Sequence, residues 1–306
     1  MDEAPHQRVQ AWRFIRTHIV HLATGAVVLA SVCGAMLVIV PYQREQRIGR
    51  AIESLGGQFG TVYRGPHWGP QSFQGSLPFC DRIQFVVLTG EAIPMDVLSE
   101  LPSLSNLEIL GLNQSRVTDS DLQQLQGMTQ LQQLWLSQTR VTDAGLAHLQ
   151  GLRHLKLLEL GDLPVTDAGL KQLTCLTNLN LIKLNGTSIT NAGLEHLRVL
   201  TGLMSLSLDN TSVTDAGLLH LNALPRLERL FLNRTQITDT GVKYLKANRN
   251  IQWLDLKSTR VTDIGLAHLR QMPQLENLAV DATQSTVEGR ALLRKALPQC
   301  SVTPNP

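Results

Sequence analysis

Apolar residues recur along this chain in the same order every 24 residues. The leucines that share this step are Leu110, Leu134, Leu158, Leu206, Leu230, Leu254 and Leu278, with Ile182 in the one gap. A threonine keeps the same step at Thr118, Thr142, Thr166, Thr190, Thr214, Thr238 and Thr262. Because the register contains no insertion, the pattern predicts a solenoid of stacked, similar units. Its strand segments are expected to start at residues 83, 107, 131, 155, 179, 203, 227, 251 and 275.

Within one unit the apolar spacing changes from that of a strand to that of a helix. Leu131, Leu134 and Leu136 are spaced as in a short strand, and a Val-Thr-Asp-Ala-Gly-Leu run with helical spacing follows. Thr142 is a suitable helix N-cap, and Asp143 lies where the helix dipole favours a negative charge. Each unit is therefore predicted to contain a strand, a turn and a short helix.

One unit cannot fold alone. Its few apolar side chains do not offset the conformational entropy lost when 24 residues become ordered. Stacking the units adds hydrogen bonds between strands and covers both sides of the leucine layer. We therefore expect one parallel sheet with the helices on its opposite side.

The repeated pattern LxxLxLxxTxVTDAGLxxL resembles the leucine-rich repeat family over about residues 83–300. The resemblance implies an α/β solenoid with a concave parallel sheet and short convex helices. It also implies that one hydroxyl per unit bonds the turning backbone, at Ser115, Thr139, Thr187, Thr211, Thr235, Thr259 and Thr283. Leu163-Pro164 occupies this place once, which predicts a local irregularity in that turn. Pro164 has no amide proton, which suits a turn residue outside the hydrogen-bond ladder.

An uncharged apolar stretch precedes the repeats. Residues 22–40 are long enough, at 1.5 Å per residue, to cross a hydrocarbon core of about 30 Å. We predict an N-terminal tail at 1–18 and a transmembrane helix at 19–40, with Trp12 and Tyr42 as interfacial aromatics. A cleaved signal peptide is the alternative, although no A-x-A site follows. A lipoprotein cysteine at Cys33 is a further alternative, with a poor lipobox before it.

The orientation of this helix rests on its short N-terminal tail. Three arginines precede the segment and three follow it: Arg8, Arg13, Arg16, Arg44, Arg47 and Arg50. The charge rule therefore does not choose a side. A short tail before a first span usually stays in the cytoplasm, so we expect a single-pass membrane protein with its solenoid outside the cytoplasm.

The segments on either side of the repeats resemble caps. We predict a linker helix and N-terminal cap at 41–82, with a helix from Tyr42 to Leu55, a strand from Gln58 to Tyr63 and a loop at 64–79. The repeats occupy 83–290, and 291–306 form the C-terminal cap and tail, with a helix from Ala291 to Leu297 and an edge strand at Cys300–Val302. The anchor and both caps resemble those of bacterial membrane-anchored leucine-rich repeat proteins.

Composition and motifs point away from several functions. The net charge is only +2 and the repeats hold no block of lysine or arginine, which argues against nucleic-acid binding. No G-x-S-x-G, H-E-x-x-H, P-loop or Cys-x-x-Cys motif occurs, so we expect neither an enzyme nor a cofactor. Metal sites are not expected either, although two columns were considered. Each column is a residue type that recurs at one position of the repeat: histidine at His148, His196, His220 and His268, and aspartate at Asp119, Asp143, Asp167, Asp215, Asp239 and Asp263. Helix capping explains the aspartates without calcium.

The strand positions that vary between units face outward on the concave side. Several of them carry aromatic, apolar or charged side chains, and aromatic residues and arginine are typical of binding hot spots. The sequence therefore predicts a protein-binding or peptide-binding surface made of Trp135, Leu157, Glu159, Leu181, Lys183, Arg229, Phe231, Trp253 and Asp255. The alternative is that these side chains only pack on neighbouring strands.

Together these features favour a membrane-anchored scaffold that recognises a protein or peptide. A structural envelope protein that acts by self-association is a second hypothesis. A third is an adaptor resembling F-box repeat proteins of ubiquitin ligases, whose repeats also carry a TDxGL-like run. Here the predicted membrane helix stands in place of any F-box-like helical domain.

Overall fold

The structure is a computed structural model that describes residues 39–63, 81–90 and 93–304. The predicted tail, almost all of the predicted membrane span and the loop at 64–79 lie outside the described residues. Among those described, no helix combines the length and the apolar character needed to cross a membrane. The described residues fall into two compact units, whose bounds are residues 1–49 with 61–82 and residues 50–60 with 83–306.

A helix spans residues 39–54. Gly56 follows it with a φ of +72°, the left-handed conformation that favours glycine after a helix. Ile48 and Ile52 of this helix are buried, as its amphipathic pattern predicts. Strand β1 (Gln58–Tyr63) follows with the predicted bounds.

One sheet runs in chain order from β1 to β11, and each neighbouring pair from β2 to β11 is parallel. Its strands are β2 (Asp81–Val87), β3 (Ile109–Gly111), β4 (Gln133–Trp135), β5 (Leu157–Glu159), β6 (Leu181–Lys183), β7 (Ser205–Ser207), β8 (Arg229–Phe231), β9 (Trp253–Asp255), β10 (Asn277–Ala279) and β11 (Ser301–Thr303). The predicted parallel sheet is confirmed. Strands β3 to β10 are three residues long and start two residues later than expected.

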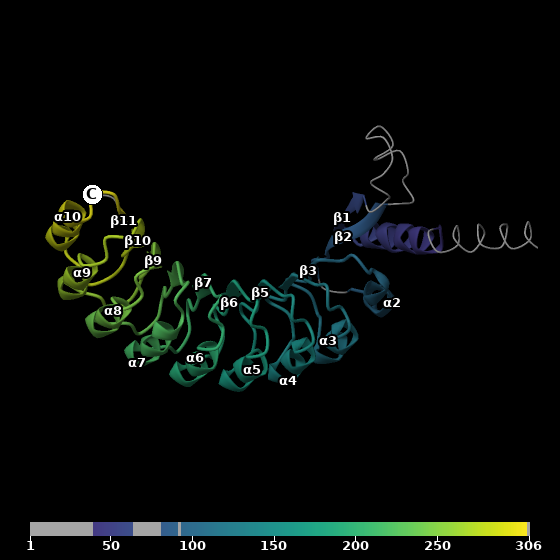
Figure 1. The fold of residues 1–306 in the computed structure, drawn as a ribbon, viewed down its shortest axis with the longest axis horizontal. Coiled ribbons are helices and arrows are strands. Elements are labelled where there is room, and N and C mark those ends of the chain that lie inside the picture. Colours follow the sequence, from purple (N-terminus) through teal and green to yellow (C-terminus); the bar gives the residue numbers. More distant parts are fainter. Residues whose placement is uncertain (1–38, 64–80, 91–92, 305–306) are drawn as a thin grey trace, which may run out of the picture. The chain divides into compact units, whose positions relative to one another are not determined.

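Short helices follow the strands. They are α2 (Met95–Glu100), α3 (Asp119–Leu125), α4 (Asp143–Leu146), α5 (Asp167–Gln172), α6 (Asn191–Leu197), α7 (Asp215–Leu218), α8 (Asp239–Leu245), α9 (Asp263–Leu269) and α10 (Val287–Ala296), with 3₁₀ turns at Leu101–Ser103, Ala147–Leu149 and Leu219–Ala223. In the compact unit that contains the repeats, the strands line the inner side of an arc and the helices line its outer side (Figure 1). The central leucine or isoleucine of strands β3 to β10 lies between these layers, at most 2% exposed.

Each strand ends in the same tight turn. The Ser or Thr hydroxyl predicted to bond the turning backbone does so, for example from Thr187 Oγ1 to the Leu184 carbonyl at 2.6 Å. The same bond occurs from Ser115, Thr139, Thr211, Thr235, Thr259 and Thr283. The residue before this position is left-handed in the turns after β3 to β10, with φ between +53° and +67°.

The irregular turn predicted at Leu163-Pro164 is not observed. Asp162 has the same left-handed φ of +57°, its amide donates to the Asn185 carbonyl at 2.7 Å, and Leu163 fills the buried position. In other repeats the residue equivalent to Pro164 donates to the preceding repeat, as Arg140 does to the Val117 carbonyl at 2.9 Å. Contrary to the prediction, this position therefore takes part in a series of backbone hydrogen bonds between successive repeats. Proline removes one bond from that series.

Successive helices are tied together by the aspartate column. Asp143 Oδ1 accepts from the Thr166 amide at 2.8 Å and Asp143 Oδ2 from the Thr166 hydroxyl at 2.5 Å. The same two bonds join Asp119 to Thr142, Asp167 to Thr190, Asp215 to Thr238, Asp239 to Thr262 and Asp263 to Thr286. Each such aspartate therefore stabilises the next repeat, in addition to its place at the start of its own helix. We call this set of bonds the Asp-Thr ladder.

The ladder also explains the repeated glycine. A Cβ atom added to Gly193 would lie 2.3 Å from Asp167 Oδ1, and the matching glycines Gly145 and Gly169 face the same obstacle. A side chain at this position would displace the carboxylate from the threonine. The glycine is thus required by close approach rather than by backbone conformation.

The ladder is modified at its two ends. Met95 stands 24 residues before Asp119, so no aspartate reaches Thr118 from the preceding repeat. Asp121 accepts from both the Thr118 amide and its hydroxyl at 2.8 Å and takes the place of glycine in this first unit. At the other end Val287 stands where the aspartate would be, so the unit of α10 has no carboxylate at this position.

Asn191 replaces the aspartate once within the array. Its Oδ1 accepts from the Thr214 amide at 2.9 Å, and its Nδ2 donates to the Thr214 hydroxyl at 2.8 Å. The bond between repeats is kept with its polarity reversed at the hydroxyl. Thr214 makes no side-chain cap bond to α7, unlike Thr142 and Thr190, which cap α4 and α6.

The C-terminal edge of the sheet is closed by an arginine. The Ser301 amide and the Thr303 carbonyl bond toward β10, so the carbonyl of Val302 points to the open edge. Arg294 of α10 donates to the carbonyls of Val302 at 3.1 Å and Pro304 at 2.5 Å. The predicted closing helix and edge strand are present, with the helix starting at Val287. Arg294 leaves few groups free to pair with another strand.

We expect Gly193→Ala to destabilise the protein by roughly 1–3 kcal/mol, because the new methyl group would collide with Asp167. Helix propensity alone would give a gain of about 1 kcal/mol. Urea unfolding of both variants tests this, with Gly127→Ala as the control, because an added Cβ there meets no atom within 4 Å. A Gly193→Ala protein as stable as the wild type would contradict the steric role of the ladder.

Candidate protein-binding face

The predicted binding residues lie on the outer positions of strands β4 to β9. In each strand the middle residue is buried, so the first and third residues share the other face of the sheet. The register places them in two groups. The N-terminal cluster is Trp135, Leu157, Glu159, Leu181 and Lys183, and the C-terminal cluster is Arg229, Phe231, Trp253 and Asp255.

Strand β7 separates the two clusters. Its outer residues, Ser205 and Ser207, are each only 9% exposed, although they belong to the face that the sequence predicts to bind. Their register partners are Leu181 and Lys183 on one side and Arg229 and Phe231 on the other. The larger neighbours cover the serines, so this strand adds little accessible surface between the clusters.

The polar groups of the N-terminal cluster already bond within the protein. Lys183 Nζ lies 2.6 Å from Glu159 Oε1, and Asn113 Nδ2 donates to Glu159 Oε2 at 3.3 Å. Trp135 packs over its strand neighbour, because a Cβ added to Gly111 would lie 2.7 Å from Trp135 Cε3. Its indole nitrogen is buried and has no hydrogen-bond partner among the described residues. For Trp135, the alternative of packing on a neighbouring strand describes the geometry.

The C-terminal cluster is more open. Trp253 is 43% exposed, and its ring centroid lies 6.3 Å from that of Phe231 in a tilted pair at 42°. Arg229, which pairs with Trp253 in the register, is exposed as well. Asp255 Oδ1 accepts from the Lys257 amide at 2.9 Å, and Asp255 Oδ2 lies 4.0 Å from Lys257 Nζ.

A hollow of about 230 Å³ opens beside this cluster, which we call the C-terminal hollow. Besides Phe231, Trp253 and Asp255 it is lined by Lys257, Asn277, Leu278, Ala279, Ser301 and Thr303. Asn277 and Ala279 occupy the outer positions of β10, but they are not among the residues predicted to bind. The sequence feature that could have identified them is a small or uncharged side chain at an outer strand position next to an aromatic residue.

Comparison with solved structures identifies the fold. No protein-family model and no curated protein matches the chain. The structure of internalin C2 from Listeria monocytogenes is similar over 69% of this chain and 85% of its own, with 23% sequence identity and a TM-score of 0.51. The fold is a leucine-rich repeat solenoid. A second internalin of that organism, inlF, is 18% identical over 76% of this chain and 85% of its own, with a TM-score of 0.44.

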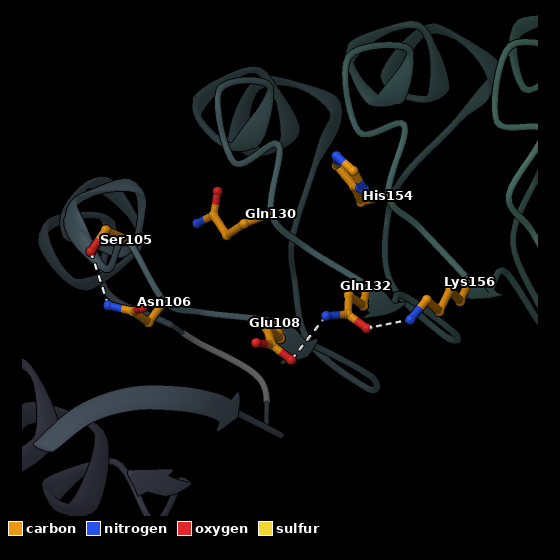
Figure 2. A pocket seen from close by; sticks show the side chains of 7 residues that line it. All are labelled: Ser105, Asn106, Glu108, Gln130, Gln132, His154 and Lys156. Carbon is orange, nitrogen blue, oxygen red and sulfur yellow. Dashed lines mark hydrogen bonds between the residues drawn. The ribbon is translucent and has the colours of Figure 1, made fainter. Parts of the chain in front are cut away.

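A second hollow, of about 310 Å³, lies beside the leucine-rich repeats near their first strands (Figure 2). Its polar side chains bond to each other across repeats. Gln132 Nε2 donates to Glu108 Oε2 at 2.9 Å, and Lys156 Nζ donates to Gln132 Oε1 at 2.8 Å. These bonds tie three repeats together and leave the hollow with few groups available to a ligand.

Within the described residues, no group of three or more His, Cys, Asp or Glu side chains is arranged to hold a metal ion. Two cysteines there are free, Cys175 and Cys300. Burial raises the pKa of the Cys300 thiol to about 11, so this thiol stays protonated near neutral pH and is a poor nucleophile.

One carboxylate of the leucine-rich repeat face is perturbed by its surroundings. Burial raises the pKa of Asp209 above its ordinary value of 3.8, and the negative charge of Asp255 acts in the same direction. Opposing effects come from the Asn233 amide, which donates to Asp209 Oδ1 at 2.7 Å, from the Ser207 hydroxyl and from the positive charge of Lys257. Ionised Asp209 therefore costs stability, and its protonation favours the fold.

We expect Asp209→Asn to increase stability at pH 7 but not at pH 3. An acid whose pKa is raised by folding stabilises the native state below its unfolded pKa, and this contribution is lost as the pH rises through the folded pKa. Asparagine keeps an acceptor for the Asn233 amide and does not titrate in this range. Melting temperatures of both proteins between pH 3 and pH 7 measure the difference. A gain that is the same at both ends of this range would contradict the ionisation argument.

Proposed function

We propose that this protein is a membrane-anchored scaffold, without enzymatic activity, that binds a protein or peptide partner through its concave face. The observation that carries the proposal is Trp253, a large aromatic side chain that is 43% exposed on an otherwise well-packed sheet and paired with Phe231 beside a hollow. Exposed aromatic residues at the centre of a patch, with arginine nearby, are typical of binding hot spots.

The membrane anchor in this proposal rests on the sequence. Residues 22–40 form an uncharged apolar stretch with the length of a membrane-spanning helix, and the repeats follow it in the chain. The short tail before this segment favours a solenoid outside the cytoplasm. A concave surface tethered at one end in this way would meet partners at or beyond the membrane surface.

Self-association into an envelope structure is the second hypothesis, and the closed edge of the sheet argues against its simplest form. Arg294 occupies the outward carbonyls of Val302 and Pro304, and Pro304 has no amide to donate. A second copy therefore finds few backbone groups to extend the sheet from β11. Recognition through side chains on the concave face is better supported.

We expect Trp253→Ala to weaken partner binding by at least tenfold, the loss typical of a hot-spot side chain. The test uses peptides selected from a displayed random library against the full chain, with dissociation constants measured by fluorescence anisotropy. The control is Ile264→Ala, which removes a side chain that is 65% exposed on α9, on the convex side. Binding that survives Trp253→Ala, or falls equally with Ile264→Ala, would argue against the concave face.

We also expect the full chain, carrying a C-terminal tag, to remain in the membrane fraction after alkaline extraction. Deletion of residues 19–40 should release it into the soluble fraction, because the apolar stretch is the proposed anchor. Protease added to intact cells should remove the tag while a cytoplasmic marker stays whole. A tag that is cut only after the cells are opened would place the solenoid on the cytoplasmic side.

A further inference from the structure

We infer that the C-terminal hollow is the anchor subsite of the binding face and takes one uncharged, apolar side chain of an extended peptide, while Asn277 bonds the backbone of that peptide. This inference rests on the proposed function and narrows it to one end of the concave face. It adds Asn277 and Ser301 to the binding residues and removes Trp135 from the anchors.

The size of the hollow limits its occupant. Its volume of about 230 Å³ is below the roughly 300–1,000 Å³ of pockets that enclose a small-molecule ligand. One side chain of a longer chain fits this volume better than a free ligand of drug size. The hollow lies on the strand face, so a segment crossing the strands could place a side chain in it.

The walls of the hollow favour an apolar side chain. Phe231 and Trp253 form a tilted aromatic pair on one side, and Ala279 adds apolar surface. Because Trp253 is already 43% exposed, covering it with an apolar side chain removes a large area from water.

The charges of the hollow point to an uncharged occupant. Its lining has one carboxylate, Asp255, and one ammonium group, Lys257, which lie 4.0 Å apart. An incoming cation would compete with Lys257, and an incoming anion would compete with Asp255. A charged anchor would thus be buried without a partner of its own, which is costly.

The floor of the hollow offers polar groups suited to a peptide backbone. Asn277 and its register neighbour Ser301 line it, and neither side chain makes a hydrogen bond within the described part of the chain. A carboxamide has both donors and an acceptor, so it matches the carbonyl and amide of one peptide unit. Such a bond holds an extended segment without selecting its sequence, and the aromatic pair selects the anchor.

The N-terminal cluster lacks this spare capacity. Trp135 is held against Gly111, and Lys183 and Glu159 form an ion pair with each other at 2.6 Å. A partner would have to break these contacts before using the groups. The two tryptophans of the predicted face therefore have different roles, and this difference gives a matched pair of variants.

The experiment uses the full chain and a 12-residue peptide selected from a displayed random library. We expect Trp253→Ala to weaken binding at least tenfold and Asn277→Leu severalfold, and Trp135→Ala to change it less than about twofold. Substituting Arg or Asp for the apolar anchor of the peptide should also weaken binding at least tenfold. Urea unfolding of each variant checks that it is folded.

Three outcomes would overturn the inference. Peptides that depend on Trp135 but not on Trp253 would leave the proposed function standing and move the anchor to the other cluster. Selected peptides that share a charged anchor would show that the hollow does not prefer a neutral one. Failure of every concave variant to change binding, or a preference for glycans over all peptides, would remove both the inference and the proposed function.

Discussion

The hydrogen bonds that each aspartate accepts from the threonine of the next repeat are the constraint on which the convex side depends. Asp167 and its equivalents satisfy the amide and the hydroxyl of a threonine that itself caps a helix. Such bonds to a charged acceptor are stronger than those between neutral groups. The glycine of the repeated motif is then needed for space, and the valine before the threonine fills the core. One interaction accounts for most of the motif.

Because these structural roles belong to other positions of the repeat, the outer strand positions on the concave side are free to vary. The leucine layer, the turn hydroxyls and the Asp-Thr ladder all lie away from the first and third strand residues, so those positions carry no shared structural duty. Large side chains at these positions differ in how far they are exposed. Trp135 covers a glycine, whereas Trp253 lies beside Asn277 of β10 and stays exposed. The hollow exists because Ala279 and Ser301 are small.

The fold was predictable from the sequence because its period is unbroken, and the parallel sheet and the turn hydroxyls are confirmed. Features that depend on contacts between repeats were not predictable in this way. The role of Asp143 in the next repeat, the regular turn at Pro164 and the packing of Trp135 each require knowing which atoms meet across a 24-residue step. The candidate residues occupy the outer strand positions that the alternation of the sequence predicts, but their accessibility depends on the size of neighbours on adjacent strands.

The ends of the array can be recognised from the same physical rule. A repeat needs the aspartate only if another repeat follows, and it needs the glycine only if an aspartate precedes it. Asp121 in the glycine position and Val287 in the aspartate position therefore mark where the Asp-Thr ladder begins and stops, and Arg294 covers the edge of β11. The small residues Ala279 and Ser301 lie at this same end of the sheet, beside Trp253. The interruption of the ladder and the hollow beside Trp253 thus occur at the same end of the array.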